Sequence, residues 1–262
     1  MEIDKRVNLN EALKPIENGA SILIGGWGPF RKPMSLIGAL AQSSLQNLTI
    51  LSFAGIDLDL LICAGKVKTG IYGFASLEGA FGGLLNFKAA RADGSVELKE
   101  MSEYMFICQF KAAAERLPFY PTRSGLGTDL LTVNPEIKTI KDPYTNQTLV
   151  AVPAFTPNYA IIHVNEADAM GNSRIIGDPY LDNLFVRAAD KVIITAERVL
   201  PVGRVQESNI KGFYVDMVIE SPGAASPGSC YPDYEISQQG FKQYSEAAKD
   251  SNLLNEYLTQ VT

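Results

Sequence analysis

The stretch SILIGGWGPFRKP, which runs from Ser21 to Pro33, decides the fold because it joins an apolar run directly to a glycine-rich turn. The run SILI is short and is bounded by a turn signal, which indicates a buried strand. Pro33 then begins a helix, because proline is tolerated in the first helical turn. A strand, a tight turn and a helix in succession predict one unit of an α/β fold with a parallel sheet.

The same alternation of short apolar runs and helix-like stretches continues outward from this unit. It predicts a mostly parallel sheet with helices on both faces. Residues 1–262 are expected to form a single domain, with room for a smaller cap, because no linker or repeat interrupts the pattern. The expected strands span residues 21–24, 48–53, 69–74, 149–152, 159–163, 192–195 and 215–219, and the expected helices span residues 9–16, 33–40, 58–64, 102–116, 178–189 and, as a polar surface tail, 235–262.

The composition is that of an ordinary globular protein: 46% of the 262 residues are apolar, 20% are charged and the net charge is −6. No basic stripe interleaved with aromatic residues is present, so nucleic acid is not an expected partner. Cys63, Cys108 and Cys230 are far apart, which argues against disulfides and a thiolate metal site and favours a reducing cytoplasm. The apolar runs fall short of the roughly 18 residues that cross a bilayer, so no membrane partner is expected either.

The glycine-rich turn has three possible interpretations. A nucleotide-phosphate loop is weakly supported, because the third glycine of a dinucleotide motif and the Gly-Lys-Ser/Thr of a P-loop are both missing. A tight turn that needs positive φ is a second interpretation. In the third, backbone N–H groups at Gly26, Trp27 and Gly28 stabilise an oxyanion, and Arg31 and Lys32 add positive charge for an acidic ligand.

Two further residues are candidates for proton transfer. His163 is the sole histidine and ends an apolar strand, so a hydrogen-bonded structural role is the better interpretation. A general base would then be a carboxylate, a lysine or a cysteine. Glu103 follows Ser102 at a helix start, where a carboxylate favours the helix dipole. The segment after it is apolar, however, and a carboxylate held against such surroundings could act as a base near neutral pH.

A second glycine-containing loop carries an arginine. Arg123 and Ser124 lie beside Gly125 and Gly127. Arg123 is expected either to bind a substrate carboxylate or to form a surface salt bridge. The polar residues that follow the strand at 159–163 are expected to form a turn.

Several segments form an ordered set between Leu9 and about Tyr234: GGWG with RKP, AGKVK, AAAERLPFYPTRSGLGTDL, VAVPAFTPNYAIIHVNEADAMGN, AAD and PGAASPGSCYPDY. Taken in this order, they resemble the alpha subunit of family I CoA-transferases. The finer resemblance is to CoA-dependent ring-opening hydrolases of steroid catabolism.

The resemblance implies an open α/β fold and a beta subunit of the same family, in an αβ or α2β2 assembly with the active site between subunits. The alpha-chain glycine loop would supply an oxyanion hole, and Arg31, Arg123, Ser124 and Gly125 would contact substrate. In the hydrolase subgroup Glu103 would be the catalytic base, whereas glutaconate-type subunits carry glutamine there. No metal or permanently bound cofactor is implied, because coenzyme A arrives within the acyl-CoA substrate.

Three functions follow as hypotheses. The first is hydrolytic, retro-Claisen opening of a ring in a cyclic keto acyl-CoA. The second is CoA transfer between carboxylic acids, with the nucleophilic glutamate on the beta subunit. Glu17-Asn18-Gly19 resembles the motif of that nucleophile but precedes the first strand, and is interpreted as a turn. The third is a non-catalytic ligand-binding module on the same fold.

Overall fold

The computed structural model describes residues 4–77 and 83–261, and it contains two sheets of different size. The larger sheet has the order β11-β10-β8-β1-β2-β3-β4, and all of these pairings are parallel. A short strand, β9 (Ser173–Arg174), adds to β8 in the antiparallel direction. The parallel strands are β1 (Ser21–Ile24), β2 (Leu48–Ala54), β3 (Val67–Ala75), β4 (Glu97–Glu100), β8 (Tyr159–Asp168), β10 (Lys191–Leu200) and β11 (Met217–Glu220).

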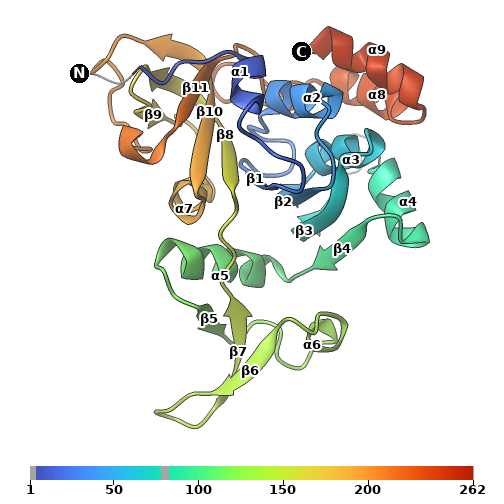
Figure 1. Ribbon diagram of the computed structural model, residues 1–262, viewed down its shortest axis with the longest axis vertical. Helices are drawn as coiled ribbons and strands as arrows, with labels where there is room; N and C mark the ends of the chain where they lie inside the picture. The colour runs from blue at the N-terminus through green and yellow to red at the C-terminus, as the bar shows by residue number, and fades with distance from the viewer. Residues whose placement is uncertain (1–3, 78–82, 262) are drawn as a thin grey trace.

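Helices cover both faces of this sheet, as predicted. Successive strand residues point to opposite faces, so Ile22 and Ile24 of β1 pack in one core and Leu23 packs in the other. The first core is covered by α1 (Leu9–Leu13), α2 (Met34–Gln42), α3 (Ile56–Cys63), α4 (Leu85–Asp93), α8 (Gln238–Ala247) and α9 (Ser251–Val261), and the second by α5 (Glu103–Ala114) and α7 (Asp182–Ala188) (Figure 1).

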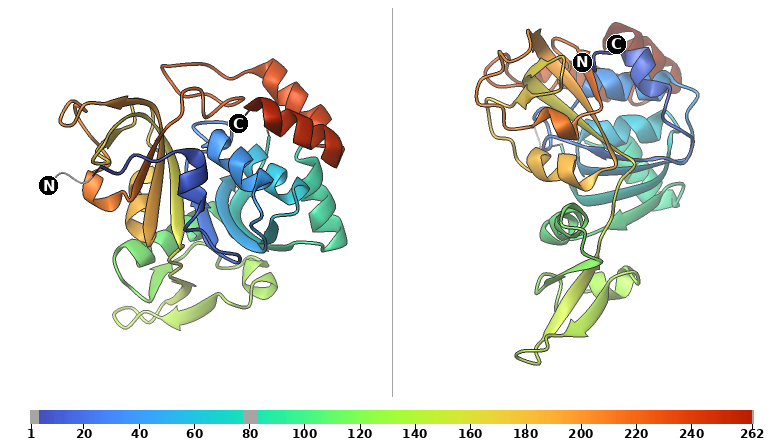
Figure 2. Two further views of the ribbon diagram at one scale, coloured as in Figure 1. Left: turned by 45° about the horizontal axis from the view of Figure 1, so that its top comes forward. Right: turned by 60° about the vertical axis from the view of Figure 1, so that its left-hand side comes forward.

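The smaller sheet projects from the main body, with α5 between the two (Figures 1 and 2). It is antiparallel, in the order β5-β7-β6, and α6 (Leu130–Val133) lies beside it. Its strands are β5 (Phe119–Thr122), β6 (Lys138–Lys141) and β7 (Thr148–Pro153). The sequence predicted only β7, because β5 is short with an internal proline and β6 is a largely exposed edge strand with lysine at both ends.

A buried carboxylate joins α8, the first of the two C-terminal helices, to the main body. Asp59 of α3 is fully buried and accepts hydrogen bonds from the Tyr244 hydroxyl at 2.5 Å and from the Phe87 N–H at 2.7 Å. Burial raises the pKa of Asp59, although these hydrogen bonds oppose the shift. The predicted surface tail is thus helical, but its apolar face contributes Phe241 and Tyr244 to the core.

Candidate functional site

The turn after β1 lies where the strand order of the large sheet reverses. From β1 the sheet extends through β2, β3 and β4 on one side, and through β8, β10 and β11 on the other. Ligands of open α/β sheets bind at the carboxyl ends of strands at such a switch point. Residues 25–33 leave the carboxyl end of β1 and therefore lie at the expected ligand edge.

The backbone of this turn confirms the tight-turn interpretation. Gly26 and Gly28 have φ values of 71° and 50°. A Cβ on Gly26 would lie 2.3 Å from the Phe30 carbonyl oxygen, so no other residue fits without a shift. The Trp27 and Phe30 N–H groups each donate to the other's carbonyl, at 3.0 and 2.8 Å. The turn is therefore closed on itself.

Most of the turn's N–H groups have partners within the chain, which corrects the prediction that all three would point at a ligand. The Gly26 N–H donates to Asp182 Oδ1 at 2.9 Å, and the Trp27 N–H donates to Phe30. Of the three N–H groups, that of Gly28, itself a buried residue, is the one left without a partner in the described part of the chain.

Arg31 does not supply free positive charge, contrary to the sequence prediction. It is 3% exposed, and its guanidinium forms an ion pair with Asp182 at 2.6 Å. The same group donates to the carbonyl oxygens of His163 at 3.1 Å and Asp178 at 2.8 Å. These internal acceptors occupy the guanidinium, so Arg31 fixes the turn within the chain.

Lys32 is likewise an internal cation. It is 1% exposed, and its ammonium lies 3.0 Å from Asp57 Oδ2 and 2.8 Å from the Ser52 hydroxyl. Burial lowers the pKa of Lys32, while the Asp57 carboxylate opposes that shift. The Gly55 N–H donates to Asp57 as well, at 2.6 Å. Lys32 therefore ties the turn to the carboxyl end of β2.

Trp27 belongs to a cluster of aromatic rings at the carboxyl edge of the sheet. Its ring centroid lies 4.4 Å from that of Phe53, 5.0 Å from Phe74 and 5.8 Å from Tyr180. Phe53 is buried, whereas Trp27, Phe74 and Tyr180 are each partly exposed. Phe53 also contacts Phe106 of α5 at 4.8 Å. The cluster thus joins the turn to the helix that carries Glu103.

Glu103 is the first residue of α5 and is exposed, so the predicted apolar enclosure of its carboxylate is wrong for this chain alone. The apolar residues that follow it, Met105 and Phe106, turn into the core instead. Ser102 caps the helix by accepting the Met105 N–H at 3.2 Å. The start of α5 packs closely on β3, because a Cβ on Gly73 would lie 3.1 Å from Glu103 Cα.

The loop at 123–127 packs against the same helix end. The hydroxyl oxygens of Ser124 and Ser102 are 2.8 Å apart, and a Cβ on Gly125 would lie 2.8 Å from Met105 Sδ. Arg123 is exposed and donates to Gln147 Oε1 at 2.7 Å. Within residues 4–77 and 83–261 no carboxylate lies within ion-pair distance of it, although its charge helps to lower the pKa of Asp142.

The structural interpretation of His163 is confirmed. The ring is fully buried, with Nδ1 2.9 Å from the Thr195 hydroxyl and Nε2 2.7 Å from Glu197 Oε1. Burial by itself would raise the pKa of Glu197, but hydrogen bonds from His163, the Gly223 N–H and Tyr234 outweigh it and lower the pKa. Cys230 offers a third metal-ligand atom within 4.8 Å, yet burial and Glu197 raise its pKa to about 12, which favours the neutral thiol over a ligand thiolate.

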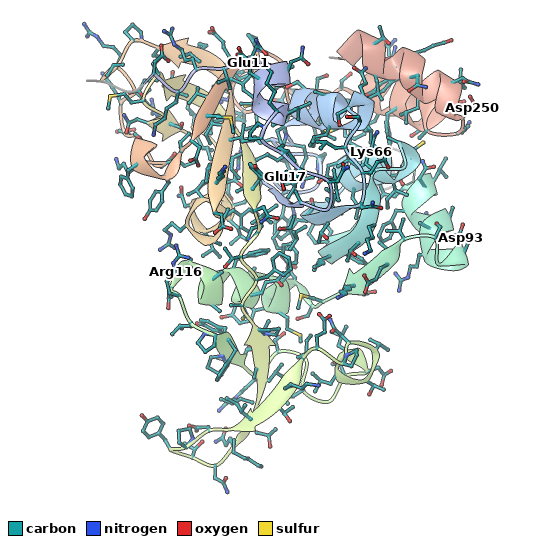
Figure 3. The ribbon with its side chains drawn as sticks, in the orientation of Figure 1. Glu11, Glu17, Lys66, Asp93, Arg116 and Asp250 are labelled. Carbon is teal, nitrogen blue, oxygen red and sulfur yellow. The ribbon has the colours of Figure 1, made fainter. Side chains whose placement is uncertain are left out.

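Two other predicted turns are present, one at the amino end of β1 and one after β8, although β8 continues to Asp168 before the chain turns. Asn18 accepts the Gln46 N–H at 2.8 Å, and Gly19 has a φ of 81°, so Glu17-Asn18-Gly19 is a turn at the amino end of β1 (Glu17 is labelled in Figure 3). Asp168 accepts the Met170 N–H at 3.0 Å and closes the turn after β8. In the described ranges no helix is long and apolar enough to span a membrane.

Sequence reasoning missed Asp57, Asp182 and Tyr180. Asp57 could have been found, because it follows the Phe-Ala-Gly that ends β2 and lies in the first turn of α3. Asp182 carries no comparable signal, since it lies 151 positions from the arginine that it pairs with. Tyr180 has a φ of 47°, which tyrosine rarely adopts and which could not be predicted from the sequence.

Known proteins resemble this chain along almost its full length. The IpdA subunit of a cholesterol ring-cleaving hydrolase from Rhodococcus jostii is 37% identical, over 97% of this chain and 90% of that protein. The A-type subunit of glutaconate CoA-transferase from Acidaminococcus fermentans is 28% identical over 94% of this chain and 84% of that protein. The crystal structure of that transferase superposes with a TM-score of 0.90 at 26% identity, over 98% of this chain and 88% of the other.

A crystal structure of the decarboxylase AibA/AibB also superposes with a TM-score of 0.90, at 28% identity over 99% of this chain and 100% of that one. The family model described as coenzyme A transferase matches residues 6–221. With most of the chain inside that model and a relative of 37% identity over nearly all of it, the chain belongs to the coenzyme A transferase family.

Proposed function

We propose that this chain is the A-type subunit of a two-component CoA-thioester hydrolase that opens a ring of a cyclic keto acyl-CoA in steroid breakdown. The relatives support hydrolysis more strongly than transfer, because identity is 37% with the ring-cleaving hydrolase subunit and 28% with the glutaconate transferase subunit. Both relatives are named as subunits, which supports a partner subunit here, in an αβ or α2β2 assembly.

The observation that carries the proposal is the position of Glu103. Glu103 is an exposed residue at the start of α5 with its Cα beside β3, and α5 is joined to the Trp27 ring through Phe106 and Phe53. No hydrogen bond or ion pair holds the Glu103 carboxylate within the described part of the chain. A carboxylate with free acceptor oxygens can take a proton from water, provided that a covering surface excludes bulk solvent.

The proposed reaction needs only this base and one water molecule. Glu103 accepts a proton from water as the oxygen adds to the ring ketone carbon. Collapse of the tetrahedral oxyanion breaks the bond to the carbon between ketone and thioester, and the electron pair forms the thioester enolate. Protonation of that carbon by Glu103 restores the carboxylate. The products are a ring-opened carboxylate and a CoA thioester, so no oxidant is required and coenzyme A enters only with the substrate.

Other residues of this edge would bind the substrate. We place the Gly28 N–H as the donor to an oxyanion, because it lacks an internal acceptor. The partly exposed rings of Trp27, Phe74 and Tyr180 suit the apolar rings of a steroid-derived acyl group. Arg123, beside Ser124 and Gly125, would hold a substrate carboxylate, because its charge is unpaired. The described cysteines are free thiols, which supports activity in the reducing cytoplasm.

CoA transfer between carboxylic acids is the second candidate, favoured by the fold match to glutaconate CoA-transferase at a TM-score of 0.90. The two reactions differ in what they ask of Glu103. Hydrolysis needs it as the base, whereas transfer uses a glutamate of the partner and leaves Glu103 as a helix-start residue.

The test is Glu103→Gln, co-expressed with the partner subunit. We expect an intact fold and loss of ring opening by at least about 100-fold, the lower range for removing a general base. Glu115→Gln is the matched control, because Glu115 is an exposed glutamate at the other end of the same helix. Mass spectrometry in ¹⁸O-water should place the label in the new carboxylate. Near-normal ring opening by Glu103→Gln would overturn this mechanism, and turnover that requires an added carboxylic acid would favour transfer.

A further inference from the structure

We infer that Asp182 is a positioning residue for this reaction, which acts by fixing the turn so that the Gly28 N–H alone faces the ligand. The inference takes the identity of the reaction from the proposed function, whereas the contacts of Asp182 are the same whichever reaction the protein catalyses. Asp182 is the first residue of α7 and is completely buried. It touches no substrate in this assignment.

Asp182 binds both ends of the turn. One carboxylate oxygen accepts the Gly26 N–H at 2.9 Å, and the other accepts from the Arg31 guanidinium at 2.6 Å. The carboxylate also lies against Gly25, where an added Cβ would be 2.8 Å from Oδ1. Gly28 is thus enclosed between two residues that are held by the same side chain.

The second anchor is itself immobilised from several sides. Arg31 adopts a φ of 50°, and its own N–H donates to the Ser229 carbonyl at 2.8 Å. Its guanidinium lies 5.5 Å from the centroid of the Tyr180 ring, and that ring stacks on Trp27 at 5.8 Å. The segment that begins α7 therefore contacts the turn twice, once through the carboxylate of Asp182 and once through the ring of Tyr180.

This arrangement decides which N–H group is available. The acceptors of Gly26 and Trp27 lie inside the chain, so a ligand oxyanion meets the Gly28 N–H. Without the Asp182 acceptor, the buried Gly26 N–H would be left unsatisfied, and the turn would shift to find it a new partner. A shift of about 1 Å in a catalytic donor lowers turnover on the order of 100-fold, because the donor misses the position of the developing charge.

The test compares two double variants. A single Asp182 substitution would leave the Arg31 charge buried without its partner, so both carry Arg31→Met, which removes that charge. Adding Asp182→Asn keeps an oxygen that can accept the Gly26 N–H, whereas adding Asp182→Leu keeps the volume and removes the acceptor. We expect kcat of the leucine variant to be about 100-fold below that of the asparagine variant, with the KM values of the two variants within about 3-fold of each other.

A direct structural readout accompanies the kinetics. The Gly26 amide proton should exchange slowly in wild type and in the asparagine variant, and fast in the leucine variant, as measured by NMR hydrogen exchange. If the leucine variant does not fold, Arg31→Met with Asp182→Ala makes the same comparison with a smaller side chain. Equal kcat in the two double variants, or a loss that appears in KM alone, would overturn the positioning role.

The outcome is separable from that of the proposed function. The identity of the product, ring-opened acid or transferred CoA ester, decides the reaction. The ratio of the two double variants is measured on whichever CoA-thioester turnover the assembled enzyme performs. A transferase product together with a large ratio of kcat between the two variants would support the role of Asp182 and contradict ring opening. A ring-opened product together with a ratio near one would support ring opening and contradict the role of Asp182.

Discussion

The turn after β1 and the start of α5 lie at the same edge of the sheet, yet the chain treats their charges in opposite ways. In the turn, Arg31 and Lys32 are almost fully buried, and each has a carboxylate partner within 3.0 Å. At the start of α5, Glu103 and Arg123 are exposed, and neither has an ion-pair partner in the part of the chain that is described. The charges of the turn are thus paired within the chain, while the charges near the start of α5 are available to another molecule.

The largest expected effect is a difference in folding stability between variants of the two regions. Lys32→Met leaves Asp57 as an unpaired carboxylate in a fully buried position, which should lower the free energy of unfolding by about 3–5 kcal/mol. Arg123→Met should change it by less than about 0.5 kcal/mol, because the side chain is exposed, and should instead raise KM for a carboxylate-bearing substrate. Urea unfolding of both variants makes the comparison. A similar stability loss in both would show that the regions do not differ as their burial indicates.

A smaller effect is expected from the backbone of the same two regions. Gly26→Ala introduces a Cβ 2.3 Å from a carbonyl oxygen at a φ of 71°, and should cost about 2–3 kcal/mol. Gly127 has a φ of 75° but no atom within 4 Å of the added Cβ, so Gly127→Ala should cost only about 1 kcal/mol. The midpoint of urea unfolding, at unchanged slope, measures both. A cost for Gly127→Ala that matches the cost for Gly26→Ala would contradict the difference in packing.

A gradual pH effect tests whether the buried surroundings of Cys230 exclude water. Burial raises the pKa of the Cys230 thiol from 9.0 to about 12, with Glu197 and Asp233 adding to the shift. Since the folded-state pKa is the higher one, this contribution to stability is complete below pH 9 and is lost as the pH rises toward 12. Wild type should therefore lose stability more steeply than Cys230→Ala in this window, by up to about 1.4 kcal/mol per pH unit. Parallel pH curves would mean that water reaches the thiol.

The sequence predicted those parts of the fold that depend on local pattern. β1 matches its predicted bounds, because a short apolar run between turns has few alternatives. The Ser102 cap and the helix after it were also predictable, since capping uses neighbours in the chain. β4, with the sequence ELKE, was not, because this edge strand is mostly charged and acquires its structure by pairing with β3.

The site was less predictable than the fold, for two physical reasons. Charges near a glycine turn suggest a ligand, but whether Arg31 faces solvent depends on Asp182, which arrives from α7. The exposure of Glu103 depends on the direction of the helix face, and the apolar residues after it turned out to serve the core. The residue types were enough to locate the site at this edge of the sheet. Which charges pair with each other could be seen only in the tertiary structure.

The bond between Asp59 and Tyr244 has a consequence for the order in which the protein is made. Asp59 lies in α3, early in the chain, and its hydroxyl partner lies in α8, which is synthesised after every strand of both sheets. Until α8 emerges from the ribosome, the nascent protein carries a carboxylate without this partner and a core that lacks the Phe241 and Tyr244 side chains. This half of the molecule therefore stays incomplete during translation, and chaperones have their longest opportunity to bind it there.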